Sequence, residues 1–265
     1  YSNLIGTARL SHIRLEPVRG DEYGMLPEEL ENCCRAGGIR GVFLMPNCAN
    51  PTTCTLPEKR KDELAEVIAR NGLLLLEDDN TGIPPVQDGS YRSMFSRLPE
   101  QTIYICGSTM ALCSGLRVAF AAFPENFRTQ LLNAQFHLNI RTSSLDAEII
   151  TELILSGKAG KILEQKAELA RERNRIFNAV FPDAVPSGSP AAFFRWLPVP
   201  DCPVDGPALE RELQLKGVNI HSANRFTALR TPGKFIRLAI SSPDTAEELQ
   251  AGLNIVKQSV KSSKA

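Results

Sequence analysis

The sequence carries no excess charge of either sign, because 30 Lys and Arg residues are balanced by 30 Asp and Glu residues. This balance excludes the strongly basic surface with which proteins attract nucleic acids or anionic membranes. The chain also lacks an apolar run close to the roughly 20 residues that a membrane-spanning helix needs, and no signal peptide opens it. Neither nucleic acid nor a membrane is therefore expected as a direct partner of this chain.

The cysteines do not form a recognisable metal site or disulfide framework. Their number is odd, and they show neither a CxxC pair nor the Cys/His spacing of zinc ligands. Most lie among apolar or small residues, so we interpret them as reduced thiols of a cytoplasmic protein. The seven positions are Cys33, Cys34, Cys48, Cys54, Cys106, Cys113 and Cys202.

The chain is long enough for a large core, since 43% of its 265 residues are hydrophobic. Its first residues, Tyr1-Ser2-Asn3-Leu4-Ile5, contain neither an initiator methionine nor a tag. We therefore expect the chain to be a fragment that begins within a domain.

Apolar runs alternate with a helical pattern in the first half of the chain. A capping-box pattern with an early proline, Thr55-Leu56-Pro57-Glu58, predicts the start of a helix that ends near Gly72. The runs that predict buried strands are residues 42–45, 73–76, 102–105 and 118–123. This order predicts a mainly parallel sheet flanked by helices.

The second half of the chain has a different character. Residues 145–181 are helical in pattern, with charges such as Lys161 and Lys166 on the solvent side. Strands are predicted at 193–197, 218–220 and 235–239, and helices at 207–216 and 244–257. We predict a large α/β domain at 1–144, truncated at its start, a connecting helix at 145–181, and a small α+β domain at 182–265 that ends in a frayed tail at 259–265.

Polar residues follow three of the predicted strands. Asn50 comes after the first, Asp78 after the second, and Ser108 and Thr109 after the third. In sheets of this kind ligands bind beyond the carboxyl ends of the strands. These residues are therefore candidates for one binding site.

Four short motifs together resemble a known family. They are Asn50-Pro51-Thr52, Glu77-Asp78-Asp79, the segment 103–117 that ends in Gly115-Leu116-Arg117, and Arg237. In this order they resemble fold-type-I pyridoxal-phosphate enzymes of the class I/II aminotransferase family, and most of all the aminotransferase-like domain of GntR/MocR-type transcriptional regulators. The resemblance covers about residues 23–256. It implies the PLP-dependent transferase-like fold with its N-terminal part missing, pyridoxal 5′-phosphate as cofactor, and a homodimer.

The resemblance also implies a role for each motif. Asp78 corresponds to the carboxylate beside the cofactor's ring nitrogen, and Asn50 to the donor to its phenolate oxygen. Ser108, Thr109 and Arg117 correspond to phosphate ligands, for which hydroxyls and a bidentate guanidinium are suited.

The substrate side is implied in the same way. Arg237 corresponds to the arginine that binds the α-carboxylate of an amino acid or 2-oxo acid. Further candidates for this side are Arg195, His221, Asn224 and Arg225.

The family's lysine is missing from this segment. In the family a lysine follows the small hydroxyl residues and forms an aldimine with the cofactor, whereas here Met110 follows Thr109. Two alternatives are open. Either Met110 has replaced the lysine, or a lysine that carries covalent cofactor belongs between Thr109 and Met110 and was not recorded. Met110 is therefore kept, with Asp78, as a candidate catalytic position.

Two functions remain open from the sequence. One is an aminotransferase, and the other is the effector domain of a regulator that senses pyridoxal phosphate or an amine and binds DNA only through another domain. Several departures from the family pattern weigh against efficient turnover: Asn80 stands where the family has tyrosine, and Thr53 where it has glycine.

Overall fold

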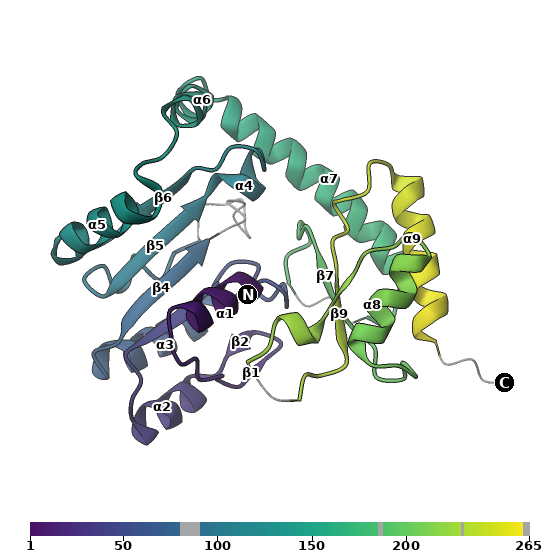
Figure 1. The fold of residues 1–265 in the computed structure, drawn as a ribbon, viewed down its shortest axis with the longest axis horizontal. Helices are drawn as coiled ribbons and strands as arrows, with labels where there is room; N and C mark the ends of the chain where they lie inside the picture. Colours follow the sequence, from purple (N-terminus) through teal and green to yellow (C-terminus); the bar gives the residue numbers. More distant parts are fainter. Residues whose placement is uncertain (80–90, 185–187, 229–230, 262–265) are drawn as a thin grey trace. The chain divides into compact units, whose positions relative to one another are not determined.

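The computed structural model describes residues 1–79, 91–184, 188–228 and 231–261, and the chain divides into two compact units (Figure 1). Unit 1 contains Tyr1–Pro17, Asn50–Thr53 and Glu168–Ala265, and unit 2 contains Val18–Ala49 and Cys54–Ala167. Each unit is described by itself below. The predicted division into 1–144, 145–181 and 182–265 remains a prediction. Asn80, the position of the family tyrosine, lies outside the described residues.

Unit 2 is built on a four-stranded sheet in the order β3 (Gly41–Leu44), β4 (Leu74–Asp79), β5 (Thr102–Gly107) and β6 (Ala119–Ala122) (Figure 1). The first three strands are parallel to one another, and β6 pairs antiparallel with β5. The expected mainly parallel sheet is thus confirmed, with one antiparallel strand at its edge.

Helices α2 (Pro27–Ala36) and α3 (Glu58–Arg70) provide the core on one face of this sheet. Leu30 of α2, Leu64 and Ile68 of α3, and Leu75 of β4 belong to one cluster and are at most 1% exposed. Burial of each such side chain contributes about 1.5–3 kcal/mol. The apolar stripe of α3 therefore fixes the helix on the strands that the sequence predicts.

The expected capping box of α3 does not form. The residue that precedes the helix is Pro57, and no side chain caps the helix. The hydroxyl of Thr55 instead accepts a hydrogen bond from the backbone N–H of Cys48 at 3.2 Å. Thr55 therefore stabilises the loop after β3 and not the helix.

The remainder of unit 2 contains a hairpin and several helices. The hairpin is formed by β1 (Gly20–Asp21) and β2 (Gly24–Met25). The helices are α4 (Ser108–Ala111), η1 (Glu125–Phe127), α5 (Arg128–Asn139), α6 (Ser144–Leu155) and the first part of α7 (Lys158–Val180). The helical pattern at 145–181 thus forms two helices, which are separated at Gly157, where φ is +73°.

Unit 1 contains a three-stranded antiparallel sheet in the order β7 (Arg195–Pro198), β9 (Phe235–Leu238) and β8 (His221–Ser222). It also contains α1 (Ser2–Leu10), α8 (Gly206–Leu215), η2 (Ala223–Arg225), α9 (Ala246–Val260) and the second part of α7. The strand predicted at 218–220 is wrong in its position, because the strand that pairs with β9 begins after it, at His221 and Ser222.

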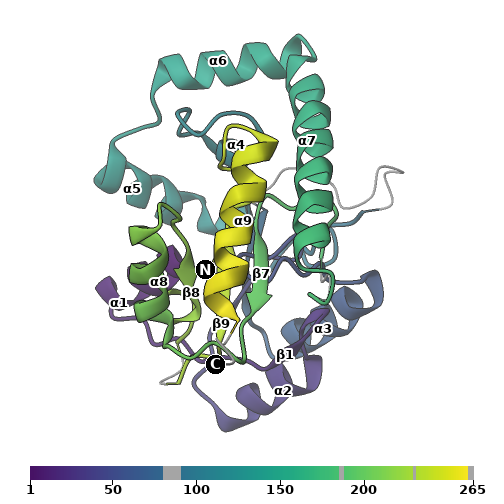
Figure 2. The same ribbon diagram turned by 90° about the vertical axis from the view of Figure 1, so that its right-hand side faces the viewer.

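Helix α9 packs on this small sheet (Figure 2). Its residues Leu249, Leu253 and Val256 share one buried cluster with Leu197 of β7 and Ile236 of β9. The helix continues to Val260, so the predicted fraying does not begin at residue 259, and residues 262–265 lie outside the described part. No helix in the described residues is long and apolar enough to cross a membrane.

Candidate active site

The carboxyl end of β4 carries three acidic residues, which alternate between the two faces of the sheet. Glu77 and Asp79 are buried with Leu75, while Asp78 is on the other face with Leu74 and Leu76. Side chains along a strand alternate in this way because its period is two residues. The three carboxylates therefore lie in different environments.

Glu77 is fully buried and has structural partners. Its carboxylate accepts backbone hydrogen bonds from Met94 at 2.9 Å and from Phe95 at 2.7 Å. Burial raises the pKa of Glu77, although these two hydrogen bonds act in the opposite direction. Glu77 thus anchors the chain at Met94 under the sheet.

Asp79 also has partners within the protein. It accepts hydrogen bonds from the Tyr104 hydroxyl at 3.1 Å and from the Asn47 amide at 3.4 Å. Burial, followed by the charge of Asp79, raises the pKa of Tyr104, so the phenol stays protonated and donates. Tyr104 belongs to an apolar run in the sequence, and nothing in that run indicates this contact.

Asp78 differs from both of its neighbours. Among the described residues, no group donates a hydrogen bond to its carboxylate. Burial, and then the charge of Asp79, raises the pKa of Asp78 to about 6. A partly buried carboxylate without a hydrogen-bond donor is stabilised by a cationic N–H group, because that group supplies both a hydrogen bond and the opposite charge.

The segment after β5 brings together the three predicted phosphate ligands. The Ser108 hydroxyl is buried and donates to the carbonyl oxygen of Val118 at 2.6 Å. The Arg117 guanidinium donates to the Thr109 hydroxyl oxygen at 3.2 Å and is otherwise exposed. Thr109 therefore keeps its own O–H for a ligand, and Arg117 keeps further N–H donors, whereas the Ser108 hydroxyl proton is already engaged.

Met110 lies in α4, between these phosphate candidates and Leu112. Its side chain has no amine or acid, so it offers no group for covalent or acid–base chemistry. Its backbone carbonyl, and that of Leu112, accept hydrogen bonds from Lys166 at 3.0 and 2.8 Å. Lys166 was predicted on the solvent side of its helix, and this prediction is wrong, because its ammonium is engaged with this segment.

In unit 1 the structure brings Asn50 and Arg237 together. The Arg237 Nη1 group donates to the Asn50 side-chain oxygen at 3.2 Å. The guanidinium lies near the rings of Phe194 and Phe226, at 5.6 and 5.1 Å from the ring centroids. Its Nε is buried and has no hydrogen-bond partner among the described residues, and burial lowers the pKa of Arg237. A half-buried guanidinium with an unused donor is suited to a carboxylate ligand.

The other substrate-side candidates differ in position. His221 pairs in register with Arg237, and burial lowers the pKa of His221. Trp196 is the register partner of Arg237 on β7, which places the adjacent Arg195 on the opposite face of the small sheet. Arg225 is paired with Glu210 at 2.8 Å, and Asn224 lies in η2.

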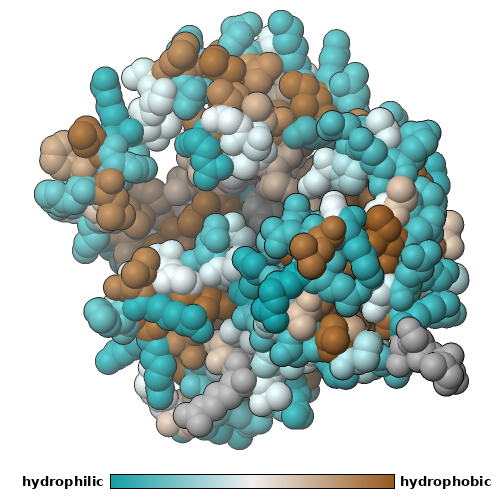
Figure 3. Space-filling model, turned by 45° about the vertical axis from the view of Figure 1, so that its right-hand side comes forward, coloured by the Kyte–Doolittle hydropathy of each residue, from teal (hydrophilic) through white to brown (hydrophobic). Residues whose placement is uncertain are grey.

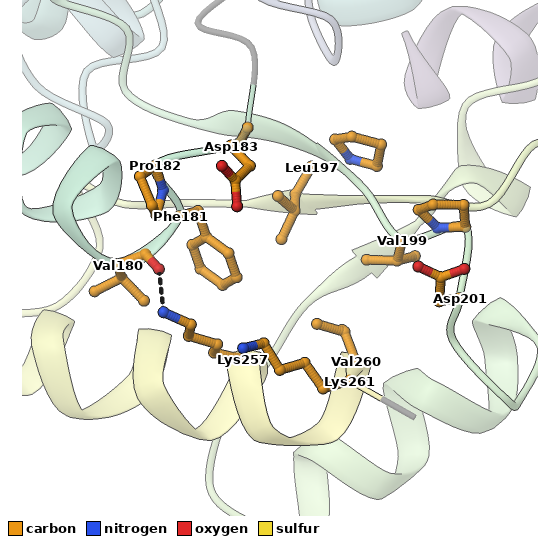
Figure 4. A pocket seen from close by; sticks show the side chains of 13 residues that line it. Val180, Phe181, Pro182, Asp183, Leu197, Val199, Asp201, Lys257, Val260 and Lys261 are labelled. Atoms are coloured by element: carbon orange, nitrogen blue, oxygen red, sulfur yellow. Dashed lines mark hydrogen bonds between the residues drawn. The ribbon is translucent and has the colours of Figure 1, made fainter. Parts of the chain in front are cut away.

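Unit 1 also has an open pocket of about 810 Å³ that contains none of the predicted site residues (Figure 4). Its floor is apolar, with Phe181, Leu197 and Val199, and Lys257 at its edge donates to the carbonyl of Val180 at 2.7 Å. The candidate residues thus form two groups, Asp78, Ser108, Thr109, Met110 and Arg117 in unit 2 and Asn50 and Arg237 in unit 1.

Known proteins resemble this chain over nearly its whole length. The family model of aminotransferases of class I and II matches residues 1–254. The HTH-type transcriptional regulator YdeF of Bacillus subtilis (strain 168) is 28% identical over 259 residues, or 97% of this chain and 55% of that protein. The 2-aminoadipate transaminase of Thermus thermophilus is 26% identical over 210 residues, or 76% of this chain and 52% of that protein.

A solved structure gives the fold. It is that of LysN, an α-aminoadipate aminotransferase from Thermus thermophilus in complex with N-(5′-phosphopyridoxyl)-L-leucine. Its TM-score is 0.87 at 23% identity, over 98% of this chain and 68% of that one. The two chains share a fold, and the present chain spans about half the length of the curated relatives that it matches.

Proposed function

Because the chain belongs to the class I and II aminotransferase family, we propose that it binds pyridoxal 5′-phosphate and serves the transfer of an amino group between an amino acid and a 2-oxo acid. When bound, this cofactor supplies an electron sink for the charge that develops at the substrate's Cα. The observation that carries the proposal is the carboxylate of Asp78, which has a raised pKa and no donor among the described residues.

Asp78 would hold the proton on the cofactor's ring nitrogen. Next to a pyridinium N–H, the carboxylate gains a charge-assisted hydrogen bond, and its pKa falls back towards the ordinary range. Asp78 would in this way keep the ring nitrogen protonated. Glu77 and Asp79 are unsuited to this role, because both carboxylates have partners within the protein.

The phosphate would bind to the segment 108–117. Arg117 presents exposed N–H donors, and Thr109 presents a hydroxyl whose oxygen already accepts from Arg117. The two side chains thus orient one another towards an anion. Ser108 joins them only if its hydroxyl leaves the Val118 carbonyl.

Asn50 and Arg237 would serve the ring oxygen and the substrate. A guanidinium can only donate, so the Asn50 group that faces Arg237 is its oxygen, and its NH₂ group remains for the cofactor's phenolate. Arg237 would bind the α-carboxylate with its remaining donors. One asparagine thereby couples the orientation of the arginine to that of the ring.

The presence or absence of a lysine between Thr109 and Met110 decides between turnover and binding. We would add pyridoxal phosphate to the purified protein, reduce it with borohydride, and analyse the peptide from Cys106 to Arg117 by mass spectrometry. A pyridoxyl-lysine between Thr109 and Met110, together with transaminase activity, would support the transfer reaction. A peptide in which Thr109 is joined directly to Met110 would limit the function to binding, and the absence of any cofactor binding would overturn the proposal.

The second candidate function is that of an effector domain, which binds pyridoxal phosphate or an amine and signals to a DNA-binding domain. It is supported by the similarity to YdeF, of which this chain matches 55%. The test is a gel-shift titration of the longest natural form of the protein on its own upstream DNA, with and without pyridoxal phosphate. Affinity that does not change with the cofactor would remove this candidate.

We also propose that the protein is a homodimer in the cytoplasm. Helix α5 contains no buried residue, and α5 and α6 expose large apolar side chains, including Phe136 at 60%, Leu145 at 70% and Leu155 at 80%. Apolar side chains are visible towards the top of Figure 3. Helices that expose several large apolar side chains are typical of protein interfaces.

A further inference from the structure

A lysine of α7 is attached to the segment that contains the phosphate candidates. The Lys166 Nζ donates to the carbonyl oxygens of Met110 and Leu112, at 3.0 and 2.8 Å. Leu112 is the residue at the C-terminal end of α4, where helix carbonyls lack partners within the helix. An ammonium at this end is favourable for hydrogen bonding and for charge.

The position of Lys166 within the hydrogen-bond network of the segment is unusual. Among the described residues, the other hydrogen bonds of residues 108–117 join the segment to itself or to the adjoining Val118. Lys166 is 54 residues further along the chain than Leu112. Lys166 therefore joins this segment by hydrogen bonds to α7, a helix that is distant in the sequence.

This contact has an electrostatic cost. Burial lowers the pKa of Lys166, which means that the surroundings disfavour its charge. A partly buried ammonium persists where hydrogen bonds compensate for lost hydration. Conversely, loss of the ammonium leaves two carbonyl groups without their donor, and the turn between them loses its attachment to α7.

We propose that Lys166 is a positioning residue for the phosphate site, and that it fixes Met110 and Leu112 so that Thr109 and Arg117 face the same anion. Thr109 directly precedes one anchored residue, and the loop from Leu112 to Arg117 begins at the other. The inference rests on the proposed function, in which Thr109 and Arg117 bind the cofactor's phosphate.

The test compares Lys166→Met and Lys166→Arg with a matched control, Lys161→Met, which removes an exposed lysine from the same helix. Hydrogen exchange is measured on the cofactor-free protein. We expect exchange in the peptide 108–117 to be about tenfold faster in Lys166→Met, as the loss of two hydrogen bonds to a charged donor implies. Lys166→Arg should restore protection, and Lys161→Met should match the unmodified protein.

The second readout separates positioning from general stability. In Lys166→Met the dissociation constant of pyridoxal phosphate should rise about tenfold, while that of pyridoxal, which lacks the phosphate, should not change. Equal loss for both ligands, or unchanged affinity for pyridoxal phosphate, would overturn the inference. If the unmodified protein binds no pyridoxal phosphate, the proposed function fails, and the phosphate role of Lys166 fails with it. The exchange data would then still show whether Lys166 holds the segment.

Discussion

Glu77 and Asp78 are adjacent in β4, yet within the described part of the chain only the carboxylate of Glu77 receives hydrogen bonds. Glu77 accepts from the backbone N–H groups of Met94 and Phe95, whereas no described residue donates to Asp78. The alternation of the strand places the first under the sheet and the second on the opposite face. Adjacent acids thus have different tasks, one in folding and one available for a ligand.

Replacement of Asp78 by Asn should stabilise the cofactor-free protein at neutral pH. The pKa of Asp78 is raised from 3.8 to about 6 in the folded protein, so the folded state binds the proton more tightly than the unfolded state does. The Asp78 carboxyl therefore lowers the free energy of unfolding as the pH rises from about 4 to about 6, and the free energy falls no further from this cause above pH 6. We expect a gain on the order of 1 kcal/mol near pH 7.5 and none near pH 4, measured by urea unfolding.

The same variant should bind pyridoxal phosphate less tightly. The neutral amide cannot stabilise a protonated ring nitrogen as a carboxylate does, and a loss of about tenfold to a hundredfold in affinity is expected. The matched control is Asp62→Asn, which removes an exposed acid from α3. Equal affinities of Asp78→Asn and the unmodified protein would assign the ring-nitrogen role to another residue.

Replacement of Glu77 by Ala should have the opposite effect on stability. It leaves the buried N–H groups of Met94 and Phe95 without an acceptor, and the expected loss is about 2–4 kcal/mol in the free energy of unfolding. Glu77→Gln keeps one acceptor oxygen and should lose less. Thermal unfolding of the two variants measures this order, and an Ala variant as stable as the Gln variant would contradict the anchoring role.

Much of the fold is predictable from local pattern, because each predicted strand in the first half is a short apolar run. The predictions that failed concern side chains whose hydrogen-bond partner is distant in the sequence, or side chains that can bind more than one partner. Thr55 has the sequence of a helix cap, but the Cys48 N–H uses its oxygen. Lys166 has the spacing of a solvated charge, but carbonyl groups 54 and 56 residues away bind it. The periodicity of apolar residues predicts which face of a helix is buried, but it does not predict which groups a side chain on that helix will bind.

The candidate site was predictable in residue type but not in hydrogen bonding. The sequence places Asp78, Ser108 and Thr109 after predicted strands. Without the family resemblance, nothing in the sequence distinguishes the environment of Asp78 from that of Asp79. The difference arises because Tyr104 donates to Asp79, across from one strand to the next. The contact between Asn50 and Arg237 joins residues 187 positions apart, which no local pattern indicates.

Replacement of Arg237 by Lys should separate substrate binding from cofactor binding. Lysine keeps the charge but loses the planar pair of donors, and it cannot both contact Asn50 and bind a carboxylate bidentately. We expect KM for the amino acid to rise about tenfold to a hundredfold, with the affinity for pyridoxal phosphate within about twofold of the unmodified protein. Steady-state kinetics and a cofactor titration measure the two values. An unchanged KM would remove Arg237 from the substrate site.

Replacement of Phe136 by Asp should weaken self-association. Phe136 is 60% exposed on α5, which has no buried residue, so the change removes no core contact within the described chain. A charge in an apolar interface costs several-fold to a thousandfold in dimer affinity, on the order of 1–4 kcal/mol. The matched control is Leu215→Asp, since Leu215 is 91% exposed on α8. Light scattering over a dilution series should show a monomer for the Phe136 variant and a dimer for the control. A Phe136 variant that dimerises as tightly as the control would place the interface elsewhere, and an unmodified protein that is monomeric at all concentrations would exclude the dimer for this chain.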